Sequence, residues 1–123
     1  MSKPWKIAYY IATVLISAGS LLGAYFELSG NEMAVGVLVH LGYPLYVNYI
    51  LGTAKILGVI GIWQNKIPFL REWAYAGFYF DLILAGVSHL AIGDGFAVIS
   101  SPLINLVILT VSYVGLRKKL GTA

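Results

Sequence analysis

The chain contains four apolar stretches, each of about the length that a membrane-spanning helix needs: residues 7–26, 46–63, 69–92 and 102–116. A helix crosses the hydrocarbon core of a bilayer with roughly 20 residues. Inside lipid every backbone N–H and C=O must be bonded within the protein, which a helix achieves by itself. The alternating polarity of barrel strands is absent. The sequence therefore predicts an all-α membrane protein, a single-domain four-helix transmembrane bundle.

Composition agrees with this class and narrows the chemistry. Of the 123 residues, 59% are hydrophobic and 11% are charged, whereas a soluble domain carries roughly 25% charged residues. Cysteine is absent, which excludes disulfides and thiolate chemistry. No nucleophile elbow, phosphate loop or dinucleotide fingerprint occurs. The sequence thus assigns no catalytic residue and leaves open whether the protein is an enzyme.

Basic residues at the ends of the apolar stretches form three clusters, before the first stretch, around the connection between the second and third, and after the fourth: Lys3, Lys6, Lys66, Arg71, Arg117, Lys118 and Lys119. With four spans, all three clusters lie on one side. Cytoplasmic segments are enriched in Lys and Arg, so we expect both termini to be cytoplasmic in a multi-pass inner-membrane protein. The first stretch lacks a cleavage site and is too long for a signal peptide. The expected partner of the whole protein is the lipid bilayer, not a nucleic acid.

A short helix is expected between the first two spans, over residues 32–41. Asn31 suits its N-cap, and Gly42-Tyr43-Pro44 ends it. This segment is too short to cross a bilayer and too apolar to stand free in water. We expect it to lie in the membrane interface or over the outer mouth of the bundle.

Two opposite charges interrupt the second and third spans. Lys55 lies twelve residues before Ile67, in the connection between these spans, and Asp81 lies fourteen residues after it. At about 1.5 Å of rise per residue, both reach a similar depth near the bilayer centre. A charge there usually faces the bundle interior and finds a partner. We therefore expect a Lys55–Asp81 contact, acting either as a buried ion pair that sets helix register or as the polar centre of a pocket.

Other polar residues follow the same helix faces. Asp81 and His89 are two i+4 steps apart, with Ser88 beside His89, and Asn48 shares a stripe with Lys55. Small residues fill the remaining positions of these stripes, so the faces suit contact within the bundle. We expect an intramembrane polar pocket formed by Lys55, Asp81, His89, Ser88 and Asn48.

Further titratable residues lie at the outer ends of the predicted spans. Glu27 ends the first span, Asp94 follows the third, and His40 belongs to the short helix. Their spacing matches no metal-binding motif, so no metal site is predicted. Because histidine titrates near neutral pH, we expect Glu27, His40 and Asp94 to form a proton-accepting or ligand-orienting cluster at the outer mouth.

Several short motifs resemble the DoxX-like family of small four-helix membrane proteins. They are Leu41-Gly42-Tyr43-Pro44, Lys55-Ile56-Leu57-Gly58, Glu72-Trp73-Ala74-Tyr75-Ala76-Gly77-Phe78 and Ser88-His89-Leu90 with Gly93-Asp94. The resemblance extends over residues 7–116. It implies a four-helix membrane fold and places Lys55, Glu72, Ser88, His89 and Asp94 in motif positions, but not Asp81. Relatives in the wider superfamily include an oxidoreductase subunit, a receptor-assembly chaperone and a cargo receptor, so the resemblance leaves function open.

Three functional hypotheses follow. The leading one is a pocket for a small lipophilic molecule, a quinone or a similar carbonyl compound, in a protein that is quinone-linked or a subunit of a membrane redox complex. In it Lys55 donates to the carbonyl, Asp81 holds Lys55, and His89 passes protons outward. The second is a non-enzymatic chaperone or assembly subunit that contacts a partner membrane subunit or a second copy of the chain. The third is a small transporter or proton-coupled channel that acts as an oligomer.

Overall fold

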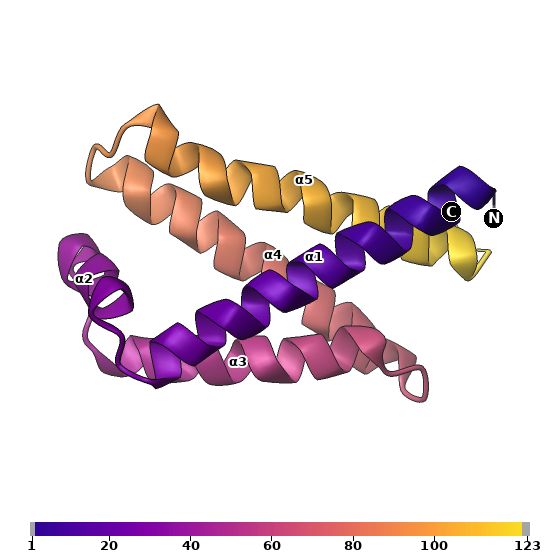
Figure 1. Cartoon of the computed structure of the whole chain (residues 1–123), viewed down its shortest axis with the longest axis horizontal. Coiled ribbons are helices and arrows are strands. Elements are labelled where there is room, and N and C mark those ends of the chain that lie inside the picture. Colours follow the sequence, from indigo (N-terminus) through magenta and orange to yellow (C-terminus); the bar gives the residue numbers. More distant parts are fainter. Residues whose placement is uncertain (1, 122–123) are drawn as a thin grey trace.

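The computed structural model describes residues 2–121 and is helical throughout, without strands in that part of the chain. Its five helices, shown in Figure 1, are α1 (Lys3–Leu28), α2 (Glu32–Leu41), α3 (Tyr46–Trp63), α4 (Pro68–Ala91) and α5 (Phe96–Lys119). All except α2 are long and apolar enough to cross a membrane. The predicted four-helix bundle with a short helix between its first two spans is thus confirmed.

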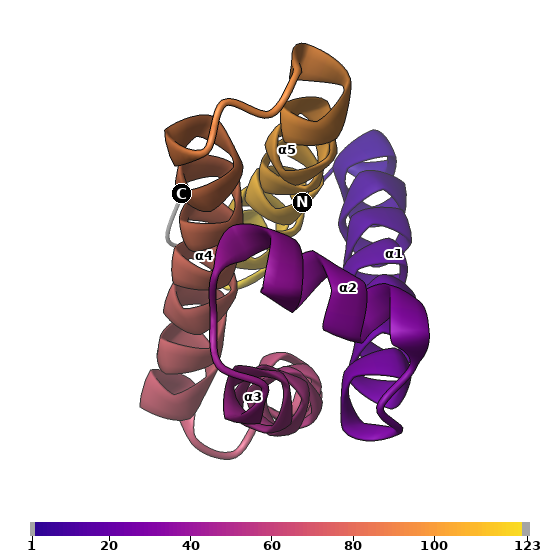
Figure 2. The same cartoon turned by 90° about the vertical axis from the view of Figure 1, so that its left-hand side faces the viewer.

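The four long helices form a ring in which α1 packs against α3 and α5, and α4 completes the ring between α3 and α5. Seen along the bundle, α2 crosses in front of the other helices at one end (Figure 2). At that end the pair α4 and α5 diverges from the pair α1 and α3, whereas the pairs meet at the opposite end (Figure 1). The bundle is therefore wedge-shaped, and α2 lies across its wide opening.

The closed end contains the core and a buried chain of hydrogen bonds. Ser112 of α5 bonds through its hydroxyl to Thr13 of α1 at 2.6 Å and to Tyr75 of α4 at 2.7 Å. Gly115 allows α5 to approach α1 closely, because a Cβ atom there would lie 2.6 Å from the Cβ of Tyr9. These contacts stabilise one end of the wedge and leave the other end free to hold a cavity.

The last span differs from the prediction at its start. It begins at Phe96, and Pro102 lies inside the helix instead of in its first turn. Proline lacks an N–H and usually breaks a helix, but neighbouring helices compensate for such positions in membrane spans. Pro102 is buried here, so packing against the bundle carries the helix past it.

Both ends of α2 have local sequence causes. The Asn31 side chain accepts a hydrogen bond from the Met33 N–H at 2.9 Å, as predicted for an N-cap. Gly42 ends the helix with φ of 81°, a left-handed conformation that glycine adopts without steric cost. The chain then turns sharply into α3, which holds α2 across the wide end.

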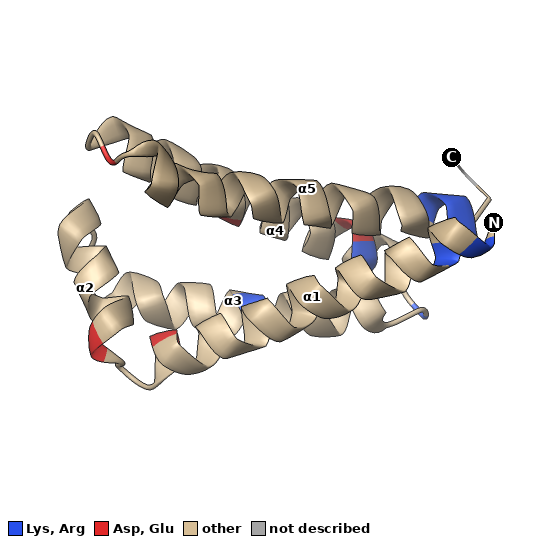
Figure 3. Ribbon diagram, turned by 45° about the horizontal axis from the view of Figure 1, so that its top comes forward, with Lys and Arg blue, Asp and Glu red and all other residues tan. Residues whose placement is uncertain are grey.

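Charged residues are distributed unevenly along the bundle. The N- and C-termini lie at the closed end, where Lys and Arg gather, whereas acidic residues dominate the wide end (Figure 3). Lys55 is the one basic residue within the central part of α3. This arrangement places the predicted basic clusters at one end of the molecule.

Candidate functional site

A cavity of about 620 Å³ occupies the wide end of the bundle. It is bounded by α1, α2, α3, α4 and α5, and most of its wall is apolar. All five residues of the predicted intramembrane pocket line it: Asn48, Lys55, Asp81, Ser88 and His89. Glu27 of the predicted outer-mouth cluster lines it as well. The structure thus brings together polar groups from three long helices around one apolar space.

Lys55 forms an ion pair with Glu27, the last acidic residue of α1. The Lys55 Nζ lies 2.5 Å from Glu27 Oε1. The side chains are 21% and 11% exposed, respectively. The Lys55 ammonium has three N–H donors, so this pairing leaves donors available on the cavity side.

The predicted direct ion pair between Lys55 and Asp81 is wrong. Both residues line the same cavity, but the ammonium bonds to Glu27. The reason is that Gly23 leaves room beside α1: a Cβ atom at Gly23 would lie 3.4 Å from Lys55 Nζ. The flexible lysine stem extends across this position and reaches Glu27, one helical turn further along α1.

Asp81 consequently has no hydrogen-bond partner among residues 2–121 and interacts with Lys55 only through their charges. A carboxylate in an apolar setting is stabilised by any donor that reaches it. Lys55 and Asp81 together offer a ligand one donor group and one acceptor group on the same wall. Both groups belong to the lining of the cavity.

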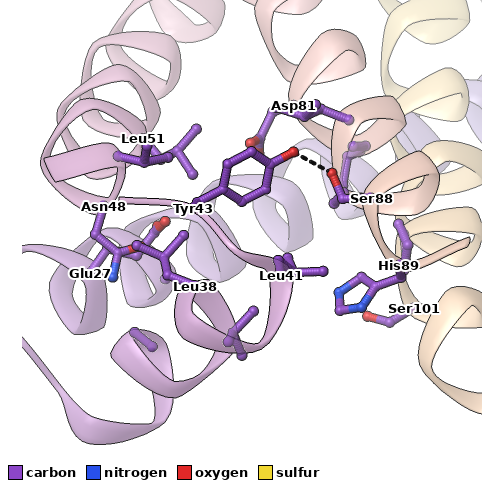
Figure 4. Close-up of a pocket in the computed structure, with 18 of the residues that line it drawn as sticks. Glu27, Leu38, Leu41, Tyr43, Asn48, Leu51, Asp81, Ser88, His89 and Ser101 are labelled. Carbon is purple, nitrogen blue, oxygen red and sulfur yellow. Dashed lines mark hydrogen bonds between the residues drawn. The ribbon is translucent and has the colours of Figure 1, made fainter. Parts of the chain in front are cut away.

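Tyr43 is a site residue that sequence reasoning missed. Its hydroxyl lies 2.6 Å from Ser88 Oγ on α4. Figure 4 shows the ring reaching across the cavity toward Ser88, near Asp81. The signal in the sequence was the position of Tyr43 in the turn after Gly42, which projects the following side chain away from α2. The contact ties the turn before α3 to α4.

A histidine–aspartate–histidine cluster joins α2 to the α4–α5 turn. His89 Nδ1 lies 2.6 Å from Asp94 Oδ2, and His40 Nε2 lies 2.9 Å from Asp94 Oδ1. Each imidazole donates an N–H to the carboxylate, which sets the tautomer when the ring is neutral. His40 and Asp94 of the predicted outer-mouth cluster are therefore in contact, and His89 joins them. Glu27, the third predicted member, pairs with Lys55 instead.

These hydrogen bonds lower the pKa of the Asp94 carboxyl below its ordinary value of 3.8, the bond from His89 contributing most and that from His40 next. The charged form accepts both bonds, so it is favoured. Asp94 therefore stays ionised in mildly acidic conditions. Among residues 2–121 no group of three or more acidic or histidine side chains has the geometry of a metal site.

Glu72, which the family resemblance places in a motif, lies outside the cavity near the closed end. Its Oε2 accepts a hydrogen bond from Tyr113 at 2.7 Å, and its Oε1 accepts one from Arg117 at 3.1 Å. A carboxylate this close to the start of α4 is also favoured by the helix dipole. The structure adds a tie between α4 and α5, which gives this residue a packing role distant from Lys55.

Taken together, the fold and cavity define an integral, multi-pass membrane protein with a polar-centred space inside its bundle. The DoxX-like family profile matches residues 11–113. The match covers most of the chain, which belongs to the DoxX-like family. Comparisons with curated proteins and with solved structures give no match.

Proposed function

We propose that the protein binds a small lipophilic molecule in the cavity at the wide end, with the polar group of that molecule at Lys55 and Asp81. The cavity itself carries this proposal. Its volume of about 620 Å³ falls in the range of roughly 300–1,000 Å³ that small-molecule sites occupy. Such sites combine an apolar wall with a few convergent polar groups, as Lys55, Asp81 and Ser88 do here.

A quinone or a similar carbonyl compound suits these groups. The Lys55 ammonium has donors left for a carbonyl oxygen after it bonds to Glu27. Asp81 is free to accept a hydrogen bond when the ligand carries a hydroxyl. His89 lines the same cavity and bonds to Asp94, which gives protons a route toward the α4–α5 turn.

The redox part of the proposal needs a second component. The chain has no cysteine, so electrons would pass through the bound ligand to a partner membrane subunit. Both termini and the basic clusters lie at the closed end (Figure 3). By the tendency of basic segments to stay in the cytoplasm, we place that end inside the cell and the cavity toward the outer face of the inner membrane.

Binding of a tail-less quinone tests this proposal directly. Tritiated duroquinone would be bound to the purified protein in detergent and measured by scintillation proximity. We expect Lys55→Met to weaken binding by about tenfold or more, equivalent to ~1.4 kcal/mol. Lys66→Met is the matched control, because Lys66 lies in the α3–α4 connection and outside the cavity. Equal binding by the native protein and Lys55→Met would contradict the proposal.

An assembly subunit is the second candidate, and an exposed small residue on α1 favours it. Ala18 is exposed, whereas Gly19 lines the interior space that also contains Lys55 and Asp81. Small residues let a partner helix approach closely in a membrane. In this case Lys55 and Glu27 serve only to hold helices together. Exchanging their charges, by Lys55→Glu with Glu27→Lys, should then preserve partner co-purification.

A further inference from the structure

A second cavity lies between α3 and α4, on the side of the bundle that faces lipid. Its volume is about 690 Å³, and α3, α4 and the first residue after α3 supply its entire lining. Several of its large apolar side chains are mostly exposed, including Leu57 at 63%, Trp73 at 68% and Phe80 at 72%. In a membrane these exposed faces contact lipid, so this cavity is a groove open to the hydrocarbon region.

The groove and the cavity at the wide end share lining residues. Leu51, Lys55, Asp81 and Leu84 line both spaces. The groove continues from these residues along α3 and α4 to Gln64 and Trp73, near the connection between the two helices. Lys55 and Asp81 are the charged residues at its inner end, and the remainder of its wall is almost wholly apolar. Lys55 and Asp81 thus lie where the cavity at the wide end meets the groove between α3 and α4.

We propose that the bound molecule is a single-chain amphiphile that enters from the lipid between α3 and α4 and leaves its hydrocarbon tail in this groove. This inference rests on the proposed function, because it uses the same polar centre for the head of the ligand. The head lies at Lys55 and Asp81, which offer a donor and an acceptor. The tail follows the apolar wall toward Trp73. A rigid, tail-less molecule would leave the groove to ordinary lipid.

Lipid tails already surround the groove, so the tail gains little from the hydrophobic effect when it moves there. Selection of a tailed ligand therefore comes from shape and from the head that anchors it. For this reason the location of the tail, and not the overall affinity, is the decisive observation. A larger side chain at position 77 can displace the tail from the groove. Gly77 lines the groove, and a Cβ atom there would meet nothing within 4 Å.

The test uses an alkyl-tailed benzoquinone with a photoactivatable diazirine at the end of its tail. The protein is labelled in vesicles of phosphatidylethanolamine and phosphatidylglycerol, and labelled peptides are mapped by mass spectrometry. We expect labels on α3 and α4 around Leu57 and Trp73. An alkane probe with the same diazirine but no head should not concentrate there.

Two variants fill the groove from opposite walls. Gly77→Leu and Leu57→Trp should each lower labelling of α3 and α4 by about tenfold, equivalent to ~1.4 kcal/mol, while duroquinone binding stays at the native level. Ala76→Leu is the matched control, because Ala76 is exposed on the same helix and lines neither space. It should label as the native protein does.

The outcomes separate this inference from the proposed function. Labels spread evenly over all helices, or equal labelling by the headless alkane, would overturn the tail assignment and identify the groove as a site of ordinary lipid. If the groove is not labelled in native membranes but becomes labelled after purification, a partner helix covers it in the cell. That result would overturn the tail assignment. Absence of duroquinone binding to the native protein would overturn the proposed function itself.

Discussion

Lys55 on α3 pairs with Glu27 at the end of α1, with 2.5 Å between Nζ and Oε1. This contact links the two helices that form one side of the wedge. It also decides what the cavity offers to a ligand, because Asp81 is left without a hydrogen-bond partner among residues 2–121. The ion pair therefore holds α1 against α3 and also leaves the Asp81 carboxylate available to a ligand.

Removing the charge of Glu27 should destabilise the protein. Glu27→Gln leaves the Lys55 ammonium without its counter-ion in a mostly apolar cavity, at a cost of about 1–3 kcal/mol. The thermal unfolding midpoint of the protein in detergent should fall. Glu32→Gln is the control, since Glu32 is exposed and belongs to no ion pair within residues 2–121. If Lys55→Met costs as much in the Glu27→Gln background as in the native protein, the two residues are not coupled.

The hydrogen bond between Tyr43 and Ser88 should restrain the turn after α2. Tyr43→Phe removes the phenolic hydroxyl and leaves the ring in place, for a loss of about 1 kcal/mol. Amide hydrogen exchange in α2 should become faster, while exchange at the closed end stays unchanged. Tyr49→Phe serves for comparison, because Tyr49 is 58% exposed and its hydroxyl forms no hydrogen bond in the described part of the chain. Unchanged exchange in α2 would show that other contacts hold the helix.

The cluster of Asp94 with His40 and His89 should survive mild acid and fail only in stronger acid. The pKa of Asp94 is lower in the folded protein than its ordinary value of 3.8. Its stabilising contribution is therefore fully present above pH 3.8 and is lost as the pH falls through the lower, folded value. Each imidazole directs an N–H at the carboxylate, so the contacts persist as long as Asp94 is ionised.

Spin labels at Val39 and Ala97 can follow this cluster, since Val39 is on α2 and Ala97 is in the first turn of α5. The distance distribution between them should stay narrow from pH 7 to pH 4 and broaden below pH 3.8. Asp94→Asn should broaden it at pH 7 and remove the acid transition. A transition in the native protein between pH 5 and pH 7 would contradict the role given to the carboxyl group.

Close packing between α1 and α5 should make Gly115 intolerant of any side chain. A Cβ atom there would lie 2.6 Å from the Cβ of Tyr9 and 3.2 Å from its Cα. Since backbone must move to admit it, Gly115→Ala should cost about 1–3 kcal/mol. Gly19→Ala, where a Cβ meets nothing within 4 Å, should be neutral or slightly stabilising. Equal unfolding midpoints for the two variants would mean that the helices are less tightly packed.

The sequence by itself determined the class of protein and most helix boundaries. Stretches of apolar residues and the turn chemistry of Asn31 and Gly42 act locally, so they can be read along the chain. The polar lining could also be foreseen, because the i+4 spacing from Asp81 to His89 depends only on helical periodicity. The start of the last span could not be predicted from the sequence. Pro102 would break an isolated helix, but here the helix begins before it, at Phe96, because the surrounding bundle packs against it.

Only the tertiary structure decided which groups meet. The partner of Lys55 depends on a flexible stem, on the room beside Gly23 and on the approach of α1 to α3, none of which residue counting along two helices can supply. Likewise, Tyr43 finds Ser88, and His40 finds Asp94, because α2 folds back across the wide end. The lipid-facing groove likewise depends on how α3 and α4 pack side by side, because these two helices supply nearly all of its lining. Depth follows from position in the sequence, whereas contact follows from how the helices tilt.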